Sequence, residues 1–168
     1  YANEVSIMKN QKVILKYDSV YEREQYKLGR IEGTVTADSI IKLIDIADLS
    51  ANPREAKIGE ITDDIIDSLS LDDGLFHFKT KGLLIAAGEC RALERKRYQL
   101  HFQDSDIEGI LDGGHNTLAI ALHILREAIG DEHPDVRKIK RWDDLHEVWV
   151  EHRQEIAAVQ DCFSFLTP

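Results

Sequence analysis

The stretch that decides the fold is Gly109–Leu122, which reads GILDGGHNTLAIAL. The segment Gly109–Leu111 is apolar and predicts a short strand. From Thr117 to Ile129, apolar residues recur at intervals of three and four, which predicts an amphipathic helix that Gly130 ends. The polar turn between them, Asp112-Gly113-Gly114-His115, therefore joins a strand to a helix.

Working outward from this turn, the chain shows further strand and helix patterns. Apolar runs and period-two alternation predict strands at Glu4–Tyr17 (as two short strands or one hairpin), Leu75–Phe78, Gly82–Ala87 and Tyr98–Phe102. Helical periodicity predicts a helix over Ile58–Leu69, whose buried face includes Ile61, and a second over Trp142–Ala158. The segment Asp38–Ile46 fits either a strand or a short helix. We expect one α+β domain over residues 1–168, with a mixed sheet and packed helices.

Bulk composition limits the functions that the chain can have. Its 168 residues include 43% hydrophobic residues and carry a formal net charge of −10. This charge disfavours unspecific adhesion to nucleic acid or anionic membranes, so a polyanion would need a local basic site. No apolar run is long enough to span a bilayer, and two distant cysteines indicate neither a disulfide framework nor a zinc ribbon. We therefore expect a cytoplasmic protein that does not act in a membrane.

The two ends of the sequence suggest a longer natural chain. The sequence starts at Tyr1, without an initiator methionine, and its last residues, from Cys162 to Pro168, are largely apolar. We expect this segment to be part of a longer protein, and to contact either further domains of that protein or a second copy of itself.

The turn before the helix has the chemistry of an anion site. The first backbone N–H groups of a helix have no intrahelical acceptor, and the helix dipole adds about half a positive charge there. Gly113 and Gly114 allow a ligand to approach the backbone, and Asn116 and Thr117 offer neutral donors. His115 would act as an acid-base group, and Asp112 would hold a cation such as Mg²⁺. The alternative is that Asp112 caps the helix, the glycines form a tight turn and His115 is an ordinary surface residue.

Residues upstream carry a resemblance to known families. Asn52-Pro53-Arg54 is followed by a helix with Ser68-Leu69 near its end, then Gly74-Leu75, strands and Asp112-Gly-x-His. Over about residues 49–130 this order resembles the ParB/sulfiredoxin-like superfamily, including its DGQHR-motif relatives. The segments Asp73–Ile85 and Gly109–Thr117 also resemble the AIPR family of abortive infection and phage resistance. Asp112 and His115 stand where that family usually has Asn and Gln.

The resemblance implies a site for the phosphate of a nucleotide or nucleic acid in a prokaryotic defence or DNA-metabolism protein, with Arg54 facing the same anion as residues 112–117. It would serve an NTPase or nuclease, or else a non-catalytic interaction or sensing module with the same fold. Lys79 and Lys81, expected between two strands, are further candidate phosphate ligands. A Walker loop is absent, and the spacing of His115 and His123 does not indicate a histidine metal site.

Overall fold

A 15-residue strand, β1 (Gln11–Gln25), organises the main sheet. In the computed structural model, which describes residues 11–47, 49, 52–71 and 74–168, β1 pairs with two partners in succession. Its first part lies beside β5 (Arg97–Phe102) and its second part beside β2 (Leu28–Thr36). A register irregularity between Tyr17 and Ser19 divides the two parts. With β4 (Glu89–Leu93) and β7 (Leu166–Thr167), the order is β4-β5-β1-β2-β7.

A second sheet contains the strand that leads into the turn Asp112–His115. It consists of β3 (Leu84–Ala86) and β6 (Gly109–Asp112). Every pairing between named strands, in both sheets, is antiparallel. The α+β class is therefore confirmed, whereas the expectation of a mixed sheet is wrong. Neighbouring strands of the described sheets are either joined by hairpins or paired across long connections. None of these connections makes two neighbouring strands parallel.

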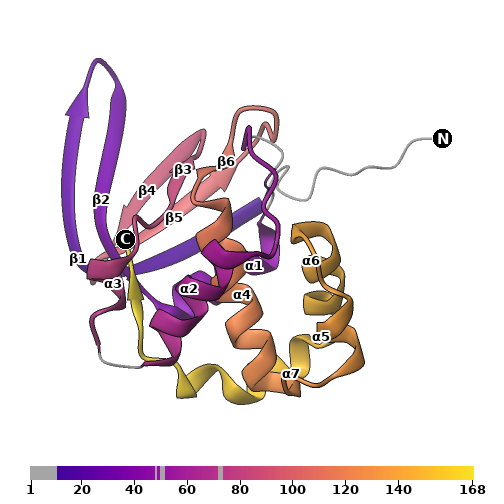
Figure 1. Cartoon of the computed structure of the whole chain (residues 1–168). Coiled ribbons are helices and arrows are strands. Elements are labelled where there is room, and N and C mark those ends of the chain that lie inside the picture. The colour runs from indigo at the N-terminus through magenta and orange to yellow at the C-terminus, as the bar shows by residue number, and fades with distance from the viewer. Residues whose placement is uncertain (1–10, 48, 50–51, 72–73) are drawn as a thin grey trace.

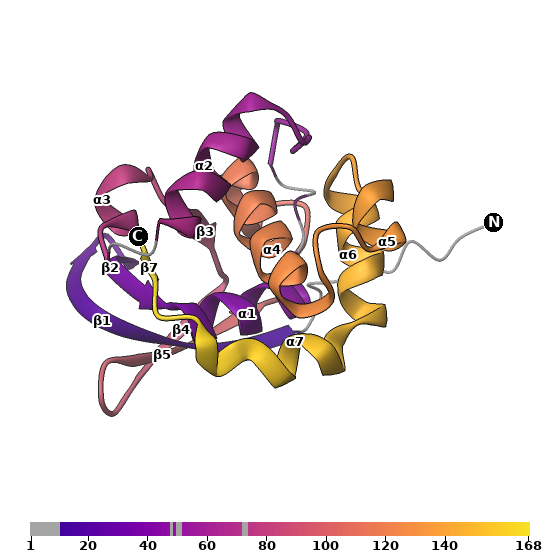
Figure 2. The same ribbon diagram turned by 60° about the horizontal axis from the view of Figure 1, so that its bottom comes forward.

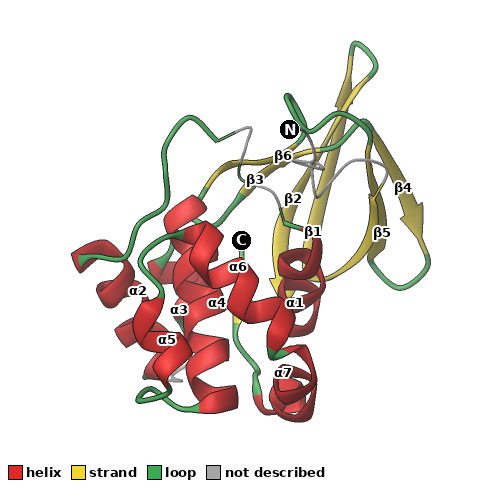
Figure 3. Cartoon of the chain, turned by 90° about the vertical axis from the view of Figure 1, so that its right-hand side faces the viewer, coloured by secondary structure: helices red, strands yellow, loops and turns green. Residues whose placement is uncertain are grey.

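The helices gather on one side of the strands, as Figure 3 shows. The central helix is α4 (Gly114–Ile129), in which Leu118, Ile120 and Leu122 are fully buried. Figures 1 and 2 show the other helices around it. These are α1 (Ala37–Ile46), α2 (Glu60–Ser70), α5 (Pro134–Lys138), α6 (Trp142–Glu151) and α7 (Arg153–Val159), with the short α3 (Phe76–Lys79) and η1 (Gln160–Cys162). Their apolar faces share one core with the sheet.

Several predicted elements differ in the structure. The expected strand Leu75–Phe78 is wrong: the chain forms α3 there, because one helical turn buries Phe76, whose ring lies 6.0 Å from that of Phe165. The expected helix over Trp142–Ala158 is broken at His152 into α6 and α7. Ile61 is 61% exposed and does not belong to the buried face of α2. The segment Asp38–Ile46, which was expected to be either a strand or a short helix, belongs to helix α1.

The hairpin of β1 and β2 projects beyond the rest of the molecule, as Figures 1 and 3 show. Its two-residue turn, Tyr26-Lys27, has φ angles of 52° and 66°. Two positive φ angles match the type I′ turn, whose twist suits a hairpin. Of the two short strands or one hairpin expected within Glu4–Tyr17, the part from Gln11 to Tyr17 belongs to β1, and residues 4–10 lie outside the described part. Among the described residues, no helix has the length and apolar character needed to cross a membrane.

Candidate functional site

The turn before α4 begins with a glycine in the left-handed region. Gly113 is the N-cap of α4 with φ 91° and ψ 23°. A Cβ at this position would lie 2.4 Å from the carbonyl oxygen of Gly82, so a side chain is excluded by both backbone angle and space. The Gly113 N–H donates to Asp112 Oδ1 over 2.8 Å. The Asp112 carboxylate therefore binds the turn itself and does not cap the first turn of the helix.

Two polar side chains in the first turn of α4 form hydrogen bonds, one to the N-cap of the helix and one to the segment before β3. The Thr117 hydroxyl is fully buried and donates to the Gly113 carbonyl over 2.9 Å. The Asn116 amide donates to the Gly82 carbonyl over 2.8 Å. Both side chains, predicted as phosphate donors, thus already have acceptors within the protein. Within the described residues, the backbone N–H groups of Gly114, His115 and Asn116 have no acceptor, as expected for a helix start.

The Asn52–Arg54 loop lies against the same turn. A Cβ on Gly114 would come within 2.8 Å of Asn52 Nδ2 and 3.5 Å of the Ala56 side chain, so these side chains already fill the space beside this glycine that was predicted to admit a ligand. Asn52 Oδ1 also accepts the Arg54 backbone N–H over 3.0 Å, which fixes the loop conformation. The structure therefore brings the Asn-Pro-Arg segment and the Asp-Gly-Gly-His turn together, although they lie far apart in the sequence.

The residues that follow this loop are anchored to the start of α6. The Ile58 N–H donates to the Lys140 carbonyl over 2.9 Å, and the Trp142 N–H donates to the Ala56 carbonyl over 3.2 Å. Glu55 lies next to Arg54 and is paired with Lys57 at 2.9 Å and with Arg141 at 3.5 Å. The hydrogen bond from Lys57, supported by Arg141, lowers the pKa of the Glu55 carboxyl below its ordinary value. The negative charge beside Arg54 is thus partly balanced by two other cations.

A third segment, Lys81–Leu83, completes the surroundings of the turn. Gly82 has φ 77° and packs against both Gly113 and the C-terminal Pro168. The Pro168 carbonyl accepts the Leu83 N–H over 3.0 Å. Gly82 is a residue whose role sequence reasoning missed; its only sequence signal is a glycine directly before an apolar strand. Lys81 is exposed beside it.

The predicted site residues fall into two groups. Asp112, Arg54 and Lys81 are exposed, and His115 is half-buried, all on the segments that meet at the start of α4. No hydrogen bond or ion pair of the His115 or Arg54 side chain is found within the described part of the chain. Lys79 is also exposed, but it is the last residue of α3 and does not lie between two strands as predicted.

Comparisons with known proteins do not add to this geometry. No family model, no curated protein and no solved structure matches this chain.

Proposed function

We propose that the N-terminus of α4 binds the phosphate group of a nucleotide. The observation that carries the proposal is that the loop at Asn52, the segment at Gly82 and the turn at Gly113-Gly114 meet at this helix start. Their close packing positions backbone N–H groups that have no acceptor among the described residues, where the helix dipole is positive. Arg54 and Lys81 are the nearby cations on two of these segments. The resemblance to the ParB/sulfiredoxin-like superfamily and to AIPR proteins supports the same proposal and suggests a role in phage defence.

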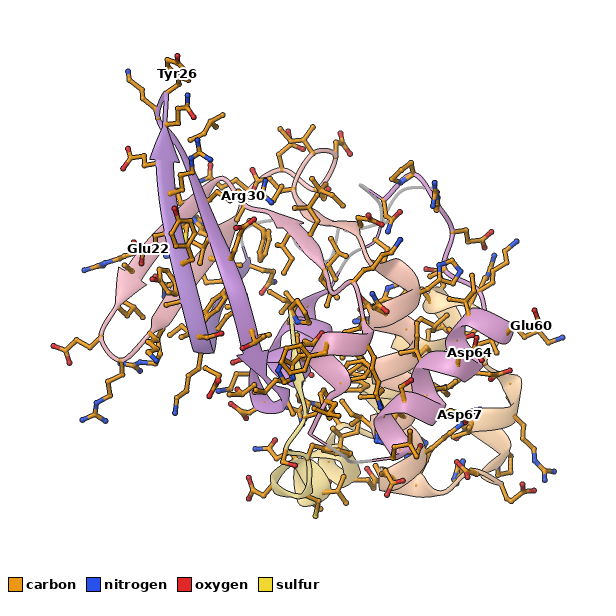
Figure 4. The ribbon with its side chains drawn as sticks, turned by 60° about the vertical axis from the view of Figure 1, so that its left-hand side comes forward. Glu22, Tyr26, Arg30, Glu60, Asp64 and Asp67 are labelled. Carbon is orange, nitrogen blue, oxygen red and sulfur yellow. The ribbon has the colours of Figure 1, made fainter. Side chains whose placement is uncertain are left out.

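Charge around the site favours a small phosphate compound over a long nucleic acid. Helix α2 follows the Arg54 loop and packs on α4. Its outer face carries Glu60, Asp64 and Asp67, which point away from the body of the protein in Figure 4. These carboxylates would repel an extended polyanion that crosses the helix start. A mononucleotide is short enough to avoid them.

Chemistry at the bound phosphate would come from two side chains. His115 is in the first turn of α4, so its imidazole would donate a proton or hydrogen bond to the phosphate. Asp112 is exposed and uses Oδ1 for the Gly113 N–H; its carboxylate would hold Mg²⁺ between itself and the phosphate. A phosphohydrolase is therefore the reaction class that we propose, with binding as its first requirement.

The direct test is the effect of nucleotides on thermal stability. We expect ATP or GTP with Mg²⁺ to raise the melting temperature of the protein, since ligand at 100 times its dissociation constant adds about 2.7 kcal/mol to the free energy of unfolding. Arg54→Ala and His115→Ala should reduce this shift while leaving the melting temperature without ligand unchanged. Phosphate release from ATP, measured by colorimetry, separates turnover from binding.

The matched control is Arg30→Ala, because Arg30 is an exposed arginine on the projecting hairpin, away from α4. This variant should keep the full shift. If no nucleotide or short duplex DNA stabilises the protein, or if Arg54→Ala and Arg30→Ala respond alike, the proposed site is wrong.

A second candidate, a non-catalytic interaction module, is favoured by the hairpin of β1 and β2. Its exposed side chains include Tyr21, Tyr26 and Leu28, which are 64%, 88% and 76% exposed. Large apolar side chains on a projecting element are typical of a contact surface for another protein. On this alternative the turn at Gly113 serves only to join β6 to α4.

A further inference from the structure

Three side chains with metal-binding atoms meet beyond the C-terminal end of α4. His133 is the N-cap of α5, Asp135 lies in the first turn of α5, and His152 stands at the break between α6 and α7. Since α4 has 16 residues and is about 24 Å long, this cluster is well separated from the candidate phosphate site at the other end of the helix. The spacing of His133 and His152 in the sequence does not resemble any metal motif, so only the fold reveals the group.

The distances between the three donor atoms match those around a small metal ion. Asp135 Oδ2 lies 3.0 Å from His152 Nε2 and 3.6 Å from His133 Nδ1. One donor atom of each residue lies within 4.8 Å of the other two. Ligands that bind Zn²⁺ tetrahedrally at 2.0–2.1 Å are separated from one another by about 3.3–3.4 Å. Small adjustments of the side chains would therefore place an ion among them.

The hydrogen-bond geometry at His133 also fits a bound cation. Nδ1 of His133 accepts the backbone N–H of Asp135 over 3.2 Å, so this nitrogen carries a lone pair. The same nitrogen lies 3.6 Å from a carboxylate oxygen, which is also an acceptor. Two acceptors that face each other repel unless a cation or a hydrogen-bond donor lies between them. Binding a metal through Nδ1 would replace the backbone hydrogen bond by a stronger interaction.

Neighbouring side chains lie close enough to the ligands to serve as the orienting groups that known metal sites have. Glu155 Oε1 lies 3.5 Å from His152 Nδ1, a buried nitrogen without a hydrogen-bond partner in the described residues. Ligand histidines commonly donate this second N–H to a carboxylate, which directs the lone pair of the other nitrogen to the metal. On the opposite side, Lys138 donates to Asp135 Oδ1 over 3.1 Å, so that Oδ2 is the oxygen turned towards both histidines.

We propose that His133, Asp135 and His152 bind a divalent transition metal ion of the Zn²⁺ class. Two imidazoles and one carboxylate are the donors that Zn²⁺ prefers, whereas Mg²⁺ and Ca²⁺ prefer sites made of oxygen ligands. The side chains are 34%, 27% and 16% exposed, so an ion can enter from solvent and keep a water ligand. The ion would join α5 to the break between α6 and α7, and would thereby fasten the C-terminal helices to each other.

The test is calorimetric titration of the EDTA-treated full chain with ZnCl₂, CoCl₂ and MgCl₂. We expect one equivalent of Zn²⁺ to bind, a higher melting temperature with Zn²⁺, a visible Co²⁺ absorption band of tetrahedral type, and no comparable binding of Mg²⁺. His152→Gln should abolish these effects. Glu155→Gln should weaken Zn²⁺ binding by about tenfold, because it removes only the orienting carboxylate.

His133→Ser provides a second ligand variant, since a serine N-cap still accepts a backbone N–H of α5 and thus preserves the fold. The matched control is His101→Gln, which removes a histidine paired with Glu89 on the sheet and should leave Zn²⁺ binding unchanged. A folded wild-type chain that does not bind Zn²⁺ would show that the cluster is only an ion pair. Undiminished binding in His152→Gln or His133→Ser would also overturn the proposal. None of these outcomes depends on whether the N-terminus of α4 binds a nucleotide.

Discussion

At the scale of single residues, burial shifts the protonation equilibrium of His146. This side chain of α6 lies beside Trp142 with ring centroids 5.8 Å apart, and its Nε2 is buried without a partner among the described residues. Burial lowers the pKa of His146 below its ordinary value, while the carbonyls and charge of Ile44, Asp45 and Asp143 act in the opposite direction without reversing the shift. The folded protein therefore favours the neutral imidazole.

A pH dependence of stability follows from this shift. Above about pH 6.5 the imidazole is neutral in both the folded and the unfolded state, and its contribution to stability is complete. As the pH falls below that value, the unfolded chain takes up the proton first, so the free energy of unfolding decreases until the pH reaches the folded pKa. Urea unfolding at pH 7.5 and 5.5 should show a smaller decrease for His146→Gln than for the wild type. Equal decreases would contradict this assignment.

At the scale of elements, one carboxylate ties α1 to α6 and α7. Asp45 accepts hydrogen bonds from Trp149 Nε1 at 2.8 Å, Arg153 Nε at 2.7 Å and Arg153 Nη2 at 3.1 Å. Trp149 is completely buried, so its N–H has no solvent to replace a lost acceptor. The bidentate geometry also fixes the guanidinium group between the helices.

We predict that Asp45→Ala lowers the free energy of unfolding by about 1–3 kcal/mol, the cost of leaving a buried donor unsatisfied. The control on the same helix is Asp38→Ala, which removes an exposed ion pair with Lys42 and should cost less than about 1 kcal/mol. Chemical denaturation of both variants measures the difference. Similar losses in the two variants would show that the contacts of Asp45 do not join the helices energetically.

At the scale of the whole molecule, the hairpin of β1 and β2 lies outside the core. Residues 21–30 are all exposed, and Figure 4 shows Tyr26 at the tip, far from the helices. The last anchoring contact described in β1 is the hydrogen bond that Tyr98 donates to Glu22. Beyond this point the hairpin contributes little buried surface to the fold.

A shortened hairpin therefore tests whether the projecting part of β1 and β2 is needed for folding or only for contact with another protein. Arg23 pairs with Arg30, so replacing residues 24–29 by Asn-Gly closes the ladder with a favoured two-residue turn. We expect the free energy of unfolding to change by less than about 1 kcal/mol. Ile40→Ala, in the core of α1, should instead lower it by about 2–5 kcal/mol. A large loss of stability on shortening would mean that the hairpin is needed for folding and would weaken its assignment as a contact surface.

The sequence by itself determined the elements whose pattern depends on local spacing. The strand at Gly109–Leu111, the helix that begins after Gly113 and ends at Gly130, and the strand at Tyr98–Phe102 all follow from apolar periodicity and glycine positions. Burial on one face repeats with the period of the element, so these patterns are readable without knowledge of the neighbours. The strand β4 and the outer part of β1 could not be found in this way, because exposed strands at a sheet edge or in a projecting hairpin have no buried face.

Only the tertiary structure decided which side chains meet. The sequence singled out the turn at residues 112–117 and the segment at Asn52–Arg54, but their contact through Gly114 depends on how α2 packs on α4. It left the participation of Gly82 and the grouping of His133, Asp135 and His152 unseen. The physical reason is that local spacing sets backbone conformation, whereas a site joins residues that are distant in sequence and are brought together by burial of the whole core.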